Sequence, residues 1–267
     1  MWYLYIGATV RQKGSKAIAV TPGNHSLSSM GIHMNRINWL FTLSSINVLL
    51  VTIERFSFTT TVLLPPYNFL RLHEVLQMST LILFTVLIPL FLLREVTQKW
   101  AALQARNGML WLTVFAIGVY FYATGNGVHE LASFQFNTYC QPDQVTGALC
   151  GGMFFNDYYF GNGLYFLGAI LMNLPFLAFE RRYPTLTFAK SHLPILIFNS
   201  LIYALAIFAY AAFDRVWVGF VYALLMTLLV DIALVFGKKP YYHRPVTLWL
   251  AIAYTVGTLA SLPVRFH

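Results

Sequence analysis

Seven long apolar runs dominate this chain of 267 residues and restrict it to folds that a lipid bilayer supports. A helix needs about 20 mostly apolar residues to cross the hydrocarbon of a membrane. Alternating apolar and polar segments of about ten residues, which are typical of membrane-spanning β-barrels, are absent from the sequence. The runs are Ile37–Ile53, Val75–Leu93, Met109–Gly125, Phe160–Phe179, Leu193–Phe213, Val216–Phe236 and Val246–Leu262. They predict an all-α, polytopic integral membrane protein built as a bundle of about seven transmembrane helices.

The composition favours the same class. Hydrophobic residues make up 58% of the chain and charged residues only 10%, whereas about a quarter of the residues in soluble domains are charged. The formal net charge of +8 does not indicate a nucleic-acid partner, because the basic residues form no stripe with interleaved aromatic residues. The partners that we expect are membrane lipids, a lipophilic small molecule and, as an alternative, the protein subunits of a membrane complex.

The distribution of Lys and Arg predicts an orientation. Of the 17 Lys and Arg residues, Arg55, Arg71, Arg215 and Arg265 fall on one side of the runs and the other 13 fall on the opposite side. Cytoplasmic connections of membrane proteins carry an excess of Lys and Arg. We therefore expect the N-terminus inside and the C-terminus outside, in a bacterial inner membrane or an organelle membrane.

The first 36 residues differ from the rest of the chain. Met1–Val10 is apolar but too short to span, and Arg11–Ser29 is basic and lacks acidic residues. We expect residues 1–36 to form a cytoplasmic tail or an extension, followed by a seven-helix domain over 37–267. The end of the first helix is left open by Glu54-Arg55, because the helix either stops near Ile53 or continues with an internal ion pair.

Two acid–imidazole pairs and one further acid fall at boundaries of the apolar runs. His73-Glu74 begins the second run, His129-Glu130 follows the third, and Asp157 precedes the fourth. Since consecutive helices cross in opposite directions, these five residues are predicted on one side of the membrane. Ionisable groups at membrane depth are energetically expensive and for that reason indicate function.

These residue types support several kinds of site. His73, Glu74, His129, Glu130 and Asp157 could perform acid–base catalysis, or His73, His129 and Glu130 could hold zinc or iron. A structural alternative is that the same residues cap helix ends, with Asp157 as an N-cap. We do not expect haem, because both histidines stand next to acids at helix ends and no second histidine pair completes an electron path.

Two known seven-helix arrangements are not matched. A retinal Schiff base requires a lysine in the last helix, and the run Val246–Leu262 contains none. The membrane hydrolases that include alkaline ceramidases carry a His-x3-His pair in that helix, and this run has no histidine.

Two further features bear on function. The stretch 131–157 is predicted to be an aromatic outer loop covering the site, and it holds the only cysteines, Cys140 and Cys150, as a candidate disulfide. Asp231 lies inside the sixth run, with Asn173 and Asn199 as candidate partners at a similar depth.

The leading hypothesis is a membrane-embedded enzyme acting on a lipophilic substrate near the outer face. The alternative is a non-catalytic subunit of a membrane complex. A third hypothesis is a transporter or proton-coupled permease, for which Asp231 would be the link to the inner face.

Overall fold

The computed structural model describes residues 25–141, 143, 145–184, 190–237 and 240–267. The described residues form helices and contain no β-strand, only one isolated bridge between Leu63 and Arg71. The helices are α1 (His25–Arg55), α2 (Leu72–Leu76), α3 (Ile82–Val96), α4 (Gly108–Tyr139), α5 (Gly147–Phe154), α6 (Asn162–Arg182), α7 (Leu193–Phe213), α8 (Val218–Val235) and α9 (Pro245–Arg265). Two π-helical segments, η2 (Gln77–Leu81) and η4 (Phe155–Gly161), join α2 to α3 and α5 to α6.

Seven helical stretches of the described chain are long and apolar enough to cross a membrane. They are Arg36–Arg55, Leu72–Val96, Gly108–Tyr139, Gly147–Arg182, Leu193–Phe213, Val218–Val235 and Pro245–Arg265. The all-α class and the number of spans are therefore confirmed, and the architecture is compatible with a multi-pass integral membrane protein.

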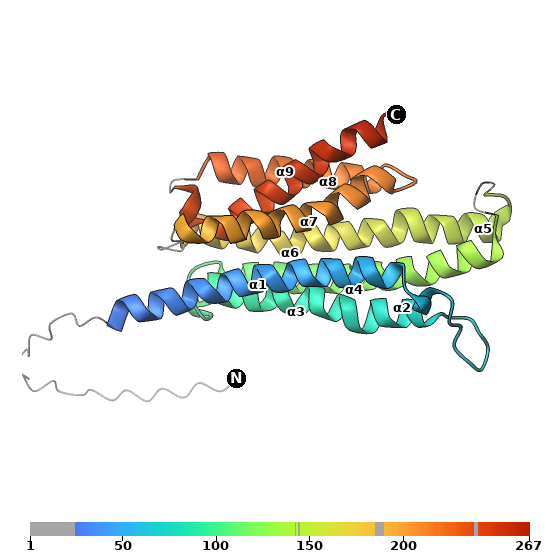
Figure 1. The fold of residues 1–267 in the computed structure, drawn as a ribbon, viewed down its shortest axis with the longest axis horizontal. Coiled ribbons are helices and arrows are strands. Elements are labelled where there is room, and N and C mark those ends of the chain that lie inside the picture. Colours follow the sequence, from blue (N-terminus) through green and yellow to red (C-terminus); the bar gives the residue numbers. More distant parts are fainter. Residues whose placement is uncertain (1–24, 142, 144, 185–189, 238–239) are drawn as a thin grey trace, which may run out of the picture.

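The spans alternate in direction and give the bundle two distinct ends (Figure 1). In this view α1, α3 and α4 form one side, α7, α8 and α9 form the other, and α6 runs between them. We call the end where α1 and α4 finish and α2 begins the histidine end, because it carries His73 and His129. The other is the opposite end.

Glycines allow α4 and α6 to approach closely. A Cβ added at Gly125 would lie 2.2 Å from the backbone nitrogen of Tyr165, and one at Gly168 would lie 2.2 Å from that of Tyr122. Small residues at helix interfaces permit such packing in membranes, where the lipid supplies no hydrophobic drive between helices. The seam fixes α4, which carries His129, against α6, which directly follows the η4 segment that carries Asp157.

The first helix begins earlier than the apolar run predicts. Helix α1 starts at His25, ahead of Ile37, and ends at Arg55, so the chain does not continue as a helix to Leu64. Residues 1–24 lie outside the described residues, and the tail over 1–36 stays a prediction.

The prediction of a long outer loop over 131–157 is wrong. Helix α4 continues to Tyr139, and Gly147–Phe154 is already helical. Within this hairpin the ring of Phe136 lies 5.5 Å from that of Phe154, whereas other aromatic side chains are exposed: Tyr139, Phe155 and Tyr159. Gly147, Gly151 and Gly152 suggest a loop, but only Gly147 has a positive φ. A disulfide joins Cys140 to Cys150 and closes the tip.

The partners predicted for Asp231 are also wrong. Its carboxylate accepts a hydrogen bond from Thr255 Oγ1, at 3.2 Å to Oδ1 and 3.1 Å to Oδ2. Asn199 instead links α7 to α1, through Nδ2 to Thr42 Oγ1 at 3.2 Å. Asn173 bonds to the Ala169 carbonyl of its own helix. Depth along a span does not specify which face of the helix a residue occupies, so depth alone could not identify these contacts.

Candidate acid–base site

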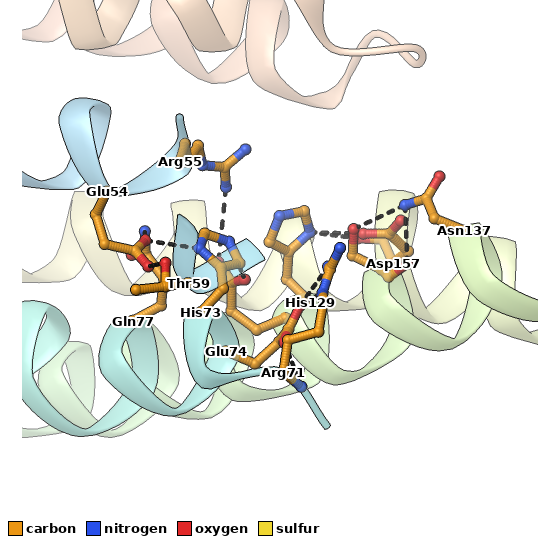
Figure 2. Close-up of polar contacts among 12 residues, drawn as sticks. Glu54, Arg55, Thr59, Arg71, His73, Glu74, Gln77, His129, Asn137 and Asp157 are labelled. Atoms are coloured by element: carbon orange, nitrogen blue, oxygen red, sulfur yellow. Dashed lines mark hydrogen bonds and ion pairs between the residues drawn. The ribbon is translucent and has the colours of Figure 1, made fainter. Parts of the chain in front are cut away.

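The first element of the site is an imidazole–carboxylate dyad between α2 and the end of α1. Nδ1 of His73 lies 2.6 Å from Oε2 of Glu54, at ion-pair distance although the angle is poor for a hydrogen bond. Two donors hold the carboxylate: Gln77 Nε2 at 2.8 Å from Oε2 and Thr59 Oγ1 at 2.5 Å from Oε1. Figure 2 shows these side chains converging from α1, from the connection that follows it and from the second span. Glu54 is therefore fixed in place, and with it the ring of His73.

Glu130 approaches the other nitrogen of His73. Nε2 of His73 lies 3.8 Å from Oε2 of Glu130, and Arg55 reaches Oε1 of Glu130 at 3.6 Å. His73 and Glu130 are buried, whereas half of the Arg55 side chain is exposed. His73 thus lies between two carboxylates, with Arg55 balancing part of their charge at the surface.

The second dyad joins α4 to the π-helical segment before α6. Nδ1 of His129 lies 2.7 Å from Oδ1 of Asp157, and Asp157 is fully buried. The His129 side chain keeps 22% of its surface exposed, against 7% for His73. Among the described residues none bonds to Nε2 of His129, and that atom is not buried. His129 therefore has one ring nitrogen held by a carboxylate and the other accessible.

Both π-helical segments contribute to this region. Gln77 belongs to η2 and Asp157 to η4. A π-bulge adds one residue to a helical turn, rotates the side chains that follow, and occurs frequently at functional sites. Gln77 bonds to Glu54 and Asp157 lies against His129, so each π-helical segment carries a residue that holds one of the dyads.

Glu74 stands apart from the two dyads. Its carboxylate accepts hydrogen bonds from the backbone nitrogen of Arg71 at 2.9 Å and from Nε of Arg71 at 2.8 Å, and the guanidinium Nη2 of Arg71 also contacts it. Arg71 in turn lies over the ring of Phe134, 5.1 Å from its centroid. Glu74 therefore caps the start of α2. Of the five candidate residues, it is the one that fits the alternative in which these residues only cap helix ends.

The connection between α7 and α8 adds a further carboxylate. Burial raises the pKa of Asp214, while its bonds from the backbone nitrogens of Val216 and Gly219 and the nearby charges of Arg265 and His129 oppose that rise. Because α7 ends and α8 begins at the histidine end, Asp214 lies at the same end of the bundle as the second dyad (Figure 1). Arg215 covers the same region, 5.7 Å from the ring centroid of Tyr158.

Three tyrosine hydroxyls form a chain deeper in the bundle. The hydroxyl of Tyr165 lies 2.9 Å from that of Tyr122 and 3.0 Å from that of Tyr210. Tyr122 precedes His129 on α4 by about two helical turns. The chain therefore forms a polar layer between the dyads and the apolar centre of the bundle.

The geometry does not support the predicted metal site of His73, His129 and Glu130. Within the described part of the chain, no group of three or more His, Cys, Asp or Glu residues is arranged to hold a metal ion. Nδ1 of each histidine faces a carboxylate of its own, and Nε2 of His73 is 3.8 Å from Glu130. Metal ligation by imidazole and carboxylate requires convergence on one point at roughly 2.0–2.2 Å.

The structure brings His73, His129, Glu130 and Asp157 to one end of the bundle, as the alternation of spans predicts, and adds Glu54 and Arg55. Glu54-Arg55 is visible in the sequence as a charged interruption of the first apolar run. The rule that ionisable groups at membrane depth indicate function could have assigned both residues to the site.

No protein-family model, curated protein or solved structure matches the chain. Its function therefore has to follow from the geometry of this site.

Proposed function

We propose that the protein is a membrane-embedded enzyme that performs acid–base chemistry on a lipophilic substrate at the histidine end. The observation that supports this most strongly is the His129–Asp157 dyad, at 2.7 Å, with Nε2 of His129 accessible. A carboxylate that holds one imidazole nitrogen fixes the orientation of the ring and stabilises its protonated form, while the other nitrogen exchanges a proton with substrate.

The two dyads have different roles in this proposal. His129 takes a proton from the substrate through Nε2 and returns it, with Asp157 as the positioning residue. The His73 ring is enclosed by Glu54 and Glu130, so it does not reach substrate. When protonated, the His73 ring offsets the negative charges of Glu54 and Glu130 close to His129. The low dielectric of the protein interior strengthens such electrostatic interactions.

The depth of the site suits a lipid-soluble substrate. At 1.5 Å per residue, α4 is about 32 Å long from Gly108 to His129, close to the hydrocarbon thickness of about 30 Å. His129 would then lie where lipid head groups meet the hydrocarbon. A substrate could remain in the bilayer while its polar part meets Nε2, and this supports a role in lipid metabolism as part of the proposal.

The orientation is part of the proposal. The excess of Lys and Arg belongs to connections at the opposite end, and this supports a cytoplasmic opposite end and an outward-facing histidine end. Cysteine labelling tests it. After reduction, a membrane-impermeant maleimide should modify Cys140 and Cys150 only from the non-cytoplasmic side. Labelling only from the cytoplasmic side would reverse the orientation and leave the site chemistry unchanged.

Untargeted lipid mass spectrometry tests the enzyme proposal. Membranes from cells producing the wild-type protein should differ in at least one lipid species from membranes containing His129→Ala, at equal protein levels. His243→Ala, at the opposite end, is the matched control and should behave as wild type. Identical lipid profiles for wild type and His129→Ala, in native membranes and with added membrane extract, would contradict the enzyme proposal and favour a non-catalytic subunit.

The second candidate function is proton-coupled transport. The hydroxyl chain Tyr122–Tyr165–Tyr210 below the site supports it, because linked hydroxyls can pass protons. Asp231, held by Thr255, would be the next ionisable group toward the opposite end. Proton flux into proteoliposomes that Tyr165→Phe abolishes, with no His129-dependent lipid change, would favour transport over catalysis.

A further inference from the structure

One turn before His129 on α4 is a buried amide oxygen that no described residue satisfies. Asn126 is 7% exposed, and its Oδ1 has no hydrogen-bond partner among the described residues. It precedes His129 by three residues and Glu130 by four, so the three side chains share one face of α4. Asn126 therefore lies between the residue that binds Asp157 and the residue that approaches His73.

Asp157 leaves a second buried atom unsatisfied. Oδ1 lies 2.7 Å from Nδ1 of His129, at ion-pair distance but without hydrogen-bond geometry, and Oδ2 is buried without a partner among the described residues. A buried polar atom without a hydrogen bond costs about 1–3 kcal/mol, and more when the group is charged. Two such atoms in one cluster indicate that a ligand or an ordered solvent molecule completes the site.

Both unsatisfied atoms are oxygens, and this restricts what can complete them. An amide oxygen and a carboxylate oxygen accept hydrogen bonds and donate none. Resting on the proposed function, we infer that the substrate presents a hydrogen-bond donor to Asn126 and Asp157, so that it is a lipid with a hydroxyl or amine head group. An anionic phosphate or carboxylate head group has only acceptor oxygens, so it would form no hydrogen bond with these two oxygens and would be repelled by them.

The same arrangement explains how such a substrate would meet the reacting nitrogen. Asn126 and His129 lie one turn apart on α4, and Asp157 contacts His129 directly. A protonated amine could donate one hydrogen to Asn126 Oδ1 and one to Asp157 Oδ2, and it keeps a third hydrogen that Nε2 can accept. A hydroxyl has one hydrogen, so it would donate to one of the two oxygens and move that same hydrogen to Nε2 as it reacts.

A head-group series with a constant alkyl chain tests the inference without a known substrate. The purified full-length protein is titrated with 1-dodecanol, dodecylamine, dodecyl methyl ether and dodecanoate, and binding is measured from the shift in thermal unfolding midpoint. We expect the alcohol and the amine to bind about fivefold to tenfold more tightly than the ether and the carboxylate, the factor for about one hydrogen bond. Equal binding of all four, or tightest binding of the carboxylate, would overturn the inference.

A matched pair of variants assigns the preference to this site. Asn126→Leu removes one of the two acceptors and should reduce the preference for the alcohol over the ether. Asn47→Leu removes another buried amide whose Oδ1 lacks a partner among the described residues, and it should leave the preference intact. A preference as large in Asn126→Leu as in the wild type overturns the inference. If Asn126→Leu does not fold, the head-group series on the wild-type protein still decides.

The experiments distinguish a wrong inference about the head group from a wrong proposal about the function. His129-dependent lipid conversion without head-group preference would reject the donor-bearing substrate and retain the enzyme. A clear preference for the alcohol and amine without any lipid conversion would retain the binding site and reject the enzyme.

Discussion

Glu180 and Asp157 belong to the same helical span, Gly147–Arg182, and both are fully buried, but their carboxylates are satisfied very differently. Glu180, at the opposite end, accepts hydrogen bonds from the backbone nitrogens of Val246 at 3.0 Å and Thr247 at 2.8 Å, and from Thr247 Oγ1 at 2.9 Å. Asp157 has one oxygen beside His129 and the other without a partner among the described residues.

The difference separates a structural carboxylate from a candidate functional one. The first backbone N–H groups of a helix have no partner within the helix, and Glu180 supplies acceptors for those of α9 from a neighbouring helix. Its bonds account for both oxygens. Asp157 orients an imidazole and retains an unused acceptor, an arrangement that costs stability unless a ligand completes it.

The largest expected effect on stability is that of Glu180→Ala. The substitution leaves two backbone donors and one hydroxyl buried without their acceptor, so we expect the free energy of unfolding to fall by about 2–4 kcal/mol. Unfolding in mixed micelles with a denaturing detergent measures it. Glu180→Gln keeps one carbonyl acceptor and should lose less. A change below about 0.5 kcal/mol for Glu180→Ala would contradict the structural role.

A smaller loss is expected for Gly161→Ala at the other end of the span. The added Cβ would lie 2.7 Å from the carbonyl oxygen of Asn156 and 2.9 Å from the backbone nitrogen of His129. Overpacking of this kind costs about 1–3 kcal/mol, and it would move η4 away from α4 and separate the dyad. The variant should lose stability and His129-dependent lipid conversion together.

Gly163→Ala is the control for that variant. A Cβ at Gly163 meets no atom within 4 Å, and alanine favours the helix by up to about 1 kcal/mol over glycine. Stability should be unchanged or higher, and conversion unchanged. Equal behaviour of the two alanine variants would show that the close approach at Gly161 does not position the dyad.

The smallest effect on stability is expected for Asp157→Asn. The carboxamide keeps the shape and relieves the burial of an unsatisfied charge, so the free energy of unfolding should change by less than about 1 kcal/mol. Lipid conversion should fall by about a hundredfold or more, because the protonated ring loses its counter-charge. Glu180→Gln should show the reverse pattern: lower stability and near-normal conversion. Loss of stability without loss of conversion in Asp157→Asn would remove the distinction between the two carboxylates.

The general fold was predictable because each apolar run is a nearly independent signal. Seven runs gave seven spans, and their alternation placed His73, His129, Glu130 and Asp157 at one end. Helix boundaries were less predictable: aromatic and glycine residues after Leu131 suggested a loop, while the chain there forms a helical hairpin closed by a disulfide.

The pairing within the site could not be predicted. Which carboxylate meets which imidazole depends on the rotation of each helix about its axis, and both π-helical segments alter that rotation in a way that residue spacing does not reveal. Glu74 adjoins His73 in sequence yet bonds to Arg71, whereas Glu54 reaches His73 from another helix. Asn126 directly follows the apolar run Met109–Gly125, and its unsatisfied oxygen is visible only in the structure.

In the proposed site His129 presents a reactive nitrogen, while His73 is enclosed. Diethyl pyrocarbonate modifies accessible, unprotonated imidazole nitrogens, and mass spectrometry can follow each histidine of the purified protein separately, with the exposed His267 as the reference. We expect His129 to react at a rate approaching that of His267, 1-dodecanol to slow this reaction, and His73 to stay unmodified until the protein unfolds. Modification of His73 as fast as that of His129, or no modification of His129 in the folded protein, would contradict this expectation.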